Sequence, residues 1–122
     1  KKYNYIENPD SLIHIYTDSE LFCLGYLTVM DNYHKPEKGL IFFDSIKSSL
    51  KHSYTVKLIY ALTKSQILLS NLDRWCKVWT NIEKVKNNKN LDVDMKLEAR
   101  NIIFKYMKGY EKYCSSDGSK KI

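Results

Sequence analysis

The chain has 122 residues, of which 43% are hydrophobic and 28% are charged, and 20 Lys and Arg against 14 Asp and Glu give a net charge of +6. This length and composition predict one soluble domain with its own core and exclude a chain that is disordered throughout. No apolar run approaches the ~18–20 residues of a membrane span and no signal peptide opens the sequence, so we expect an intracellular protein without a membrane partner. Because the sequence begins with Lys1 and not with Met, we expect it to be an excised domain.

The first forty residues predict one helix behind an irregular start. Its span is 18–33, with Asp18 or Ser19 as the N-cap and apolar residues at helical spacing behind it. Gly25 lowers its stability by about 1 kcal/mol relative to alanine. A strand is the alternative, because the aromatic and β-branched residues of 26–29 favour β structure.

Three further helices are predicted from apolar residues that recur every three to four positions. One covers 36–51. The next begins at a cap on Ser53 or Thr55 and ends before Ser70. The third carries the most regular apolar stripe in the chain, over 72–85.

A loop rich in lysine and asparagine, at 86–90, precedes the last predicted helix. Asp92 or Asp94 is the expected cap of this helix, because a carboxylate complements the positive end of the helix dipole. Its expected buried residues are Leu91, Val93, Met95, Ala99, Ile102, Ile103, Tyr106 and Tyr110.

These helices and their short connections predict an all-α fold, a single antiparallel bundle of four to five helices with an N-terminal extension. No internal repeat is evident. We expect an extension or added helix at 1–38, a helical bundle domain at 39–113 and a flexible tail at 114–122.

The three cysteines are an odd number, and none of them forms a CxxC pair. We therefore expect free thiols in a reducing compartment. Cys23 and Cys76 lie within apolar patterns and are expected to be small core residues.

No motif in the sequence indicates catalysis, a metal site or a cofactor. His14, His34 and His52 are far apart and match no metal-ligand spacing, and the four glycines form no phosphate-binding loop. Cys76 has no neighbouring histidine and fits an apolar helix face, which argues against a nucleophile. We therefore expect that the protein is not an enzyme and has no cofactor.

The positive charge predicts at most weak binding to nucleic acid. Specific recognition of guanine and phosphate relies on the planar guanidinium group of arginine, and the chain has only two arginines, Arg74 and Arg100. Trp75 and Trp79 lie one helical turn apart and could stack on bases. They share the stripe of 72–85, however, and this favours packing in the core.

One part of the sequence resembles a known family. The run from Ala99 to Lys108 resembles the closing helix of the transcription elongation factor TFIIS N-terminal domain family, with Tyr106 where tryptophan is commoner. Segments 46–51, 56–62 and 82–85 are similar to successive helices of its integrase-binding branch. The resemblance covers about residues 40–113.

This resemblance implies a helical bundle without catalysis that docks short disordered motifs of transcription and elongation proteins in the nucleus. In the family, two interhelical loops at one end form the contact surface. The first loop corresponds to Ser53, Tyr54 and Thr55, which lack the acidic residue of the integrase-binding branch. The second corresponds to Leu91 and Val93, with leucine in place of an aromatic residue.

The predicted peptide-binding site therefore combines these loop residues with nearby lysines. An apolar partner side chain buried there would contribute ~1.5–3 kcal/mol before ordering costs, and the lysines would attract an acidic-hydrophobic motif. In the alternative interpretation, Leu91 and Val93 pack on the last helix as a hydrophobic staple. The predicted site residues are Tyr54, Thr55, Leu91, Val93, Lys51, Lys86 and Lys89.

Three functions remain open at this point. The first is a protein-interaction module of transcription or chromatin machinery, whose partners are disordered protein segments. The second is a nucleic-acid-binding helical domain, with an affinity that falls steeply with salt. The third is a structural or host-interaction bundle from a microbe with A/T-rich coding, which predicts an exposed apolar patch on residues 12–30.

Overall fold

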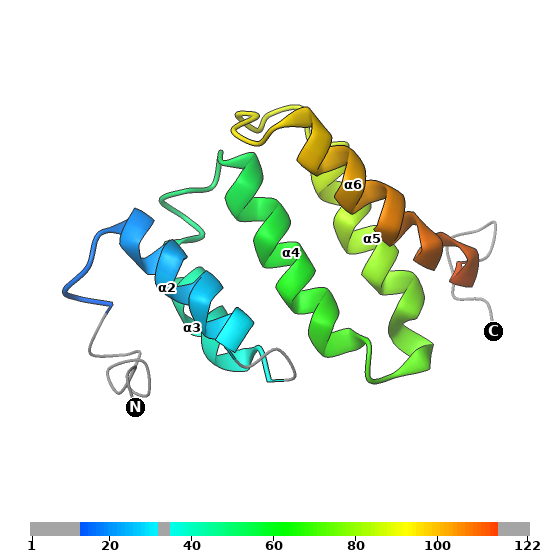
Figure 1. The fold of residues 1–122 in the computed structure, drawn as a ribbon, viewed down its shortest axis with the longest axis horizontal. Helices are drawn as coiled ribbons and strands as arrows, with labels where there is room; N and C mark the ends of the chain where they lie inside the picture. Colours follow the sequence, from blue (N-terminus) through cyan, green and yellow to red (C-terminus); the bar gives the residue numbers. More distant parts are fainter. Residues whose placement is uncertain (1–12, 32–34, 115–122) are drawn as a thin grey trace. The chain divides into compact units, whose positions relative to one another are not determined.

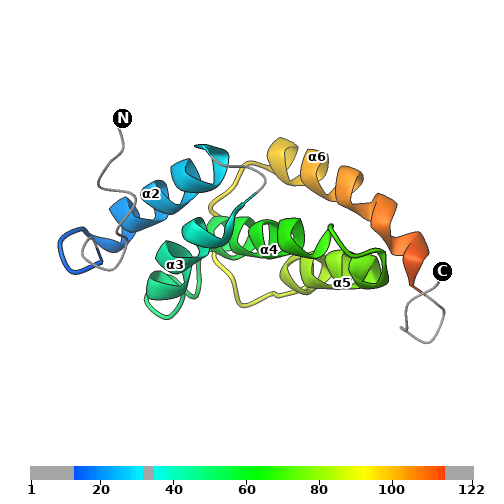
Figure 2. The same cartoon turned by 90° about the horizontal axis from the view of Figure 1, so that it is seen from below.

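The structure is a computed structural model, and it describes residues 13–31 and 35–114 of the chain (Figures 1 and 2). Regular structure in these residues consists of helices, with one isolated bridge between Ser53 and Asp92, so the predicted all-α class is confirmed. The predicted helix end at Tyr33 and the tail beyond Cys114 lie outside the described residues.

The chain divides into two compact units, residues 1–51 and 52–122. The sequence-based boundary after residue 38 falls inside the helix Glu37–Ile46, and that domain division stays a prediction. The elements are α2 (Asp18–Asp31), α3 (Glu37–Ile46), α4 (Tyr54–Leu68), α5 (Trp75–Lys86) and α6 (Leu97–Met107), with the 3-10 segments η2 (Leu72–Arg74) and η3 (Lys108–Tyr113).

Helix α2 confirms the helical prediction for this segment over the strand alternative. It begins directly after Thr17, whose backbone N–H donates to Glu20 Oε1 at 2.9 Å, while the Glu20 N–H donates to Thr17 Oγ1 at 3.3 Å. This reciprocal pair is a capping box. The expected cap at Asp18 or Ser19 is therefore wrong by one or two positions.

Two glycines allow α2 and α3 to pack closely along each other. A Cβ added at Gly25 would lie 2.6 Å from the Phe43 ring, and one added at Gly39 would lie 2.9 Å from the carbonyl oxygen of Gly25. Phe43 is buried and has no room to retreat. Gly25, which weakens the isolated helix, is thus required by the packing of that helix.

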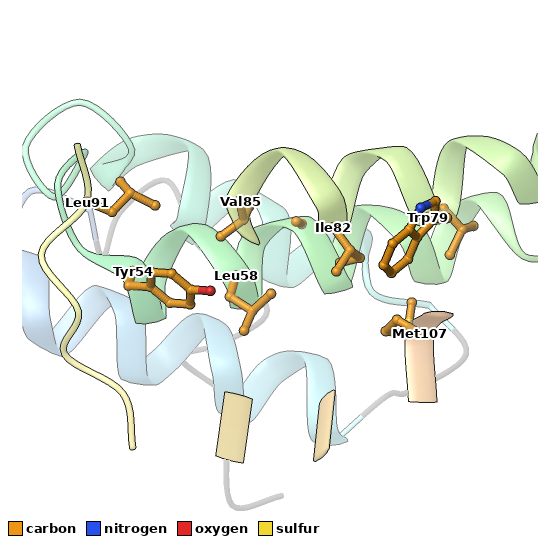
Figure 3. Close-up of a cluster of buried hydrophobic side chains, with 9 residues drawn as sticks. Tyr54, Leu58, Trp79, Ile82, Val85, Leu91 and Met107 are labelled. Carbon is orange, nitrogen blue, oxygen red and sulfur yellow. The ribbon is translucent and has the colours of Figure 1, made fainter. Parts of the chain in front are cut away.

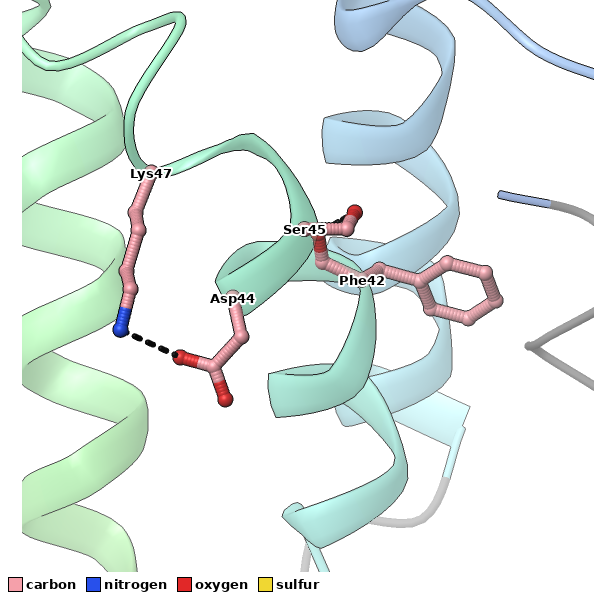
Figure 4. A network of polar contacts seen from close by, with 4 residues as sticks. All are labelled: Phe42, Asp44, Ser45 and Lys47. Carbon is pink, nitrogen blue, oxygen red and sulfur yellow. Dashed lines mark hydrogen bonds and ion pairs between the residues drawn. The ribbon is translucent and has the colours of Figure 1, made fainter. Parts of the chain in front are cut away.

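Helix α3 ends at Ile46, five residues before the predicted end, and a turn leads to His52. Figure 4 shows Ser45 at the end of the helix, where its hydroxyl donates to the Phe42 carbonyl oxygen at 2.6 Å. Ser49 bonds the Ile46 carbonyl in the same way at 3.3 Å. The Ile46 carbonyl oxygen also accepts the Leu50 N–H at 2.9 Å, so the serine hydroxyls share these carbonyl groups with the backbone.

A salt bridge lies on the exposed side of the same turn. Lys47 Nζ is 3.6 Å from Asp44 Oδ1, and both side chains are about half exposed (Figure 4). A pair this exposed contributes little to stability.

In the second unit, α4 and α5 form an antiparallel hairpin and η3 packs against α5 (Figure 1). Ser53 is the N-cap of α4, as predicted, and α5 buries the predicted stripe from Val78 to Val85. Leu72, the first residue of that stripe, is 49% exposed. Trp79 is buried, which confirms core packing for this ring. The core cluster of this unit consists of Tyr54, Leu58, Ala61, Val78, Trp79, Ile82, Val85, Leu91 and Met107 (Figure 3).

Helix α6 departs most from the sequence-based prediction. It begins at Leu97, and neither Asp92 nor Asp94 caps it. Met107 reaches the core, whereas Ile102 and Tyr106, which were expected to be buried, are 70% and 72% exposed. Periodicity identified the apolar residues of this helix without showing which of its faces the other helices cover.

Gly25→Ala is expected to lower the free energy of unfolding by about 1–2 kcal/mol. The gain in helix propensity, about 0.5–1 kcal/mol, is smaller than the about 1–3 kcal/mol cost of overpacking against Phe43. Urea denaturation followed by circular dichroism measures the change. Gly109→Ala is the matched control, because its added Cβ meets nothing within 4 Å. Equal stability of the two variants would contradict the close-packing interpretation.

Candidate functional site

The predicted site lies where the α5–α6 loop meets the N-terminus of α4. Ser53 and Asp92 form an isolated parallel bridge. The Tyr54 N–H donates to the Asp92 carbonyl oxygen at 3.0 Å, and the Asp92 N–H donates to the His52 carbonyl oxygen at 2.6 Å. The loop is therefore fixed to the start of α4 through the backbone.

Asp94 completes the cap of α4. The Thr55 N–H donates to Asp94 Oδ1 at 2.8 Å, and the Ser53 hydroxyl donates to Asp94 Oδ2 at 2.6 Å. Ser53 Oγ also accepts the Val56 N–H at 3.1 Å, and Thr55 Oγ1 donates to the Asp94 carbonyl oxygen at 2.9 Å. With the bridge, these bonds satisfy the first three N–H groups of α4. Asp94 was expected to cap the last helix, and that prediction is wrong.

These contacts lower the pKa of Asp94 below its ordinary value of 3.8. Desolvation acts in the opposite direction and would raise the pKa. The hydrogen bonds donated by Ser53 and Thr55 favour the ionised carboxylate and together outweigh desolvation.

The apolar part of the predicted peptide-binding site is largely closed to solvent. Tyr54 and Leu91 are 4% and 8% exposed and belong to the core cluster (Figure 3). The guanidinium carbon of Arg100 lies 5.5 Å from the centre of the Tyr54 ring. Thr55 is half-buried with its donors engaged by Asp94, whereas Val93 is 56% exposed. Of the predicted apolar pair, only Val93 is thus open to solvent.

The predicted lysines are all exposed. Lys86 lies with its Nζ 6.0 Å from the centre of the Phe104 ring, a cation–π contact on the outside of the core. Lys89 follows in the same loop, and Lys51 belongs to the first unit. Peptide binding by these residues stays a prediction.

Helix α6 carries an exposed apolar pair that the predicted site did not include. Ile102 and Tyr106 are one turn apart and lie on the same side of the helix. Two exposed charged residues share this side, Lys105 three residues after Ile102 and Glu98 four residues before it. We call Ile102, Lys105 and Tyr106 the α6 face.

Helix α2 carries a second exposed apolar surface. Its buried side packs in the first unit, and the residues on the opposite side recur at i, i+3, i+4 and i+7. We call this side the α2 face. Its members are Cys23, Tyr26, Leu27 and Met30, and all four are exposed.

The charge of the chain is divided unequally between the two units. Residues 1–51 contain 6 Lys and 7 Asp or Glu, a net charge of −1. Residues 52–122 contain 12 Lys and 2 Arg against 7 Asp or Glu, a net charge of +7. The second unit therefore carries the whole basic excess of the chain.

A disulfide joins Cys76 and Cys114, whose Cα atoms are 4.9 Å apart. The expectation of three free thiols is therefore wrong, and so is the core position expected for Cys23, which is free and exposed. Cys76 is buried, as predicted. Its partner is 38 residues away and reaches it because η3 packs on α5. An odd number of cysteines permits one pair and one free thiol, but the spacing does not identify the pair.

Aromatic rings pack beside this disulfide. The edge-to-face contacts of Trp75 with Tyr110 and Tyr113 have ring-centre distances of 5.6 and 4.9 Å. The Trp75 indole N–H donates to the Leu69 carbonyl oxygen at 3.1 Å. Trp75 is thus engaged within the fold on two sides, and its ring contributes to holding η3 in place.

Two properties of the described ranges, 13–31 and 35–114, bear on the class of site. No group of three or more His, Cys, Asp or Glu lies close enough there to hold a metal ion. Within the same ranges, none of the helices combines the length and the apolarity that crossing a bilayer requires.

Comparisons of the chain with protein-family models, with curated proteins and with solved structures found no match. The resemblance to the TFIIS N-terminal domain family therefore stays a prediction.

Asp94→Asn is expected to flatten the acid limb of the stability curve. Because the folded pKa lies below the unfolded one, ionised Asp94 stabilises the fold above about pH 4, and this contribution is lost as the pH falls through that range. At pH 7 the asparagine keeps one acceptor oxygen, for the Thr55 N–H, and loses the one that accepts the Ser53 hydroxyl, which should cost about 0.5–1.5 kcal/mol. Urea denaturation between about pH 3 and pH 7 measures both effects. Asp92→Asn is the control, because Asp92 enters the bridge through its backbone; equal slopes in the two variants would contradict the capping role.

Loss of the Cys76–Cys114 bond is expected to lower the free energy of unfolding by about 2–4 kcal/mol, because it frees a long loop in the unfolded chain. Thermal denaturation with and without dithiothreitol measures the effect. Reductant should destabilise the wild type and Cys23→Ser alike and should leave the Cys76→Ser/Cys114→Ser double variant unchanged. A wild type that is insensitive to reductant would show that the bond does not stabilise the fold.

Proposed function

We propose that this chain is a non-catalytic protein-interaction domain that docks an acidic, apolar segment of a partner protein on its second unit. The observation that carries the proposal is the α6 face, where Ile102 and Tyr106 are each more than two-thirds exposed. Large apolar side chains exposed side by side are typical of surfaces that another protein covers.

The energetics support a modest and reversible interaction. Covering Ile102 and Tyr106 would contribute about 1.5–3 kcal/mol for each side chain, from which the ordering of the partner is subtracted. Lys105 and the net charge of +7 on the second unit favour an acidic partner and speed its encounter. Val93 is a second exposed apolar residue of the same unit.

The cellular setting of this interaction has two candidates. A role in transcription or chromatin machinery, in the nucleus, follows from the family resemblance. The Cys76–Cys114 disulfide favours the other candidate, an exported structural or host-interaction bundle, because disulfides persist in oxidising compartments. This candidate requires an exposed apolar patch within residues 12–30, and the α2 face is such a patch.

Ile102→Asp is expected to weaken binding of an acidic, apolar helical peptide at least about tenfold, because it places a like charge where an apolar contact forms. Fluorescence anisotropy with a labelled peptide of Leu, Phe and Glu measures binding to the full chain. Leu97→Asp is the matched control, since Leu97 is also exposed on α6 but lies roughly 140° around the helix from Ile102.

Two further probes separate the alternatives. The same peptide with Lys in place of Glu should bind weakly. If single-stranded DNA binds with a steep salt dependence while the acidic peptide does not bind, the nucleic-acid alternative replaces this proposal. Equal effects of Ile102→Asp and Leu97→Asp would also contradict it.

A further inference from the structure

Helix α2 is apolar on two opposite sides. Its inner side is buried through Leu21, Thr28 and Val29 and closes tightly on α3 at Gly25. Its outer side, the α2 face, exposes four apolar or weakly polar residues in a continuous stripe. A helix that is apolar all round is normally covered on both sides, so this stripe needs a second partner surface.

The charges of α2 indicate what that surface must be. The helix carries Asp18, Glu20 and Asp31 and no Lys or Arg, and of the five α-helices in the described residues only α2 lacks a basic residue. Two α2 faces placed against each other would bring together carboxylates alone. A symmetric contact between two copies of α2 is therefore disfavoured, and a basic, apolar surface is favoured.

The α6 face is apolar and lies on a basic unit. It joins Ile102 and Tyr106 to the exposed Lys105; the exposed Glu98, four residues before Ile102, balances that lysine, so the positive charge comes from the unit as a whole, whose net charge is +7. The proposed function assigns to this face an acidic, apolar partner segment. Helix α2 has that chemistry, because it combines the exposed apolar stripe with acidic residues at both of its ends and contains no Lys or Arg.

We propose that the α2 face of one copy of the chain docks on the α6 face of a second copy. This inference rests on the proposed function and names its partner. The contact is heterologous, since each copy offers one surface of each kind. Contacts of this type lead to rings or to open chains of molecules, not to a closed symmetric dimer. Assembly should therefore grow with concentration, and salt should weaken it because opposite charges meet.

The test uses sedimentation velocity on the parent, which is the full unsubstituted chain without reductant, so that the Cys76–Cys114 bond is kept. A non-reducing gel of the same samples checks that no crosslink through Cys23 contributes to the mass. At low salt, the mean mass is expected to rise with concentration beyond that of a dimer. Leu27→Asp on the α2 face and Ile102→Asp on the α6 face should each weaken assembly at least about tenfold. Asp31→Lys should do the same while favouring the helix dipole, and Leu97→Asp should assemble like the parent.

Mixing the two face variants gives the decisive measurement. Leu27→Asp keeps its α6 face and Ile102→Asp keeps its α2 face, so an equimolar mixture should form a one-to-one dimer that grows no further. A parent that stays monomeric at every concentration would overturn the inference. Loss of assembly in Leu27→Asp without rescue by Ile102→Asp would indicate a contact between two α2 faces and would also overturn it.

The same variants separate this inference from the proposed function. If Leu27→Asp binds the acidic peptide while the parent does not self-associate, the α6 face takes a foreign partner and only the inference fails. If the peptide fails to bind any variant and no assembly forms, the proposed function fails as well.

Discussion

The N-terminus of α4 is completed by residues that come much later in the chain, and the second unit depends on this junction. Asp92 pairs with the backbone at residues 52–54, and Asp94 accepts hydrogen bonds from Ser53 and Thr55. Free N–H groups at a helix start would otherwise need water or another partner. Because the junction fixes the loop before α6, it also places Leu91 in the core. The same contacts that order this end of the unit thus leave little apolar surface open there.

Local signals in the sequence were enough for much of the fold. Ser53 as a cap and the stripe of α5 are set by residues within one or two turns of each other, and both predictions are confirmed. Asp94 and Cys76 act through partners 38 to 41 residues away, at Ser53, Thr55 and Cys114. An aspartate before a helix is a good cap for that helix, and nothing in the sequence indicates that it caps an earlier one.

The candidate site was harder to predict than the fold for a related reason. Apolar periodicity identifies side chains that can be buried, but tertiary packing decides which of them are. Leu91 lies in a loop and is buried, whereas Ile102 and Tyr106 lie in the predicted stripe of a helix and are exposed. The predicted lysines are exposed, as lysines in folded proteins usually are. Burial of the last helix through Met107 depends on its packing against α5 and η3, which sequence spacing does not define.

The disulfide has a consequence for the covalent topology of the second unit. Cys76 and Cys114 enclose the lysine- and asparagine-rich loop, the α4 cap at Asp94 and the whole of α6 in one closed ring. A protease that cleaves one peptide bond inside this ring, for example after an exposed lysine such as Lys89, would leave both pieces of the polypeptide attached to each other. A nicked molecule would therefore keep its full mass until the sulfur bridge is reduced, and it could retain its last helix after being cut.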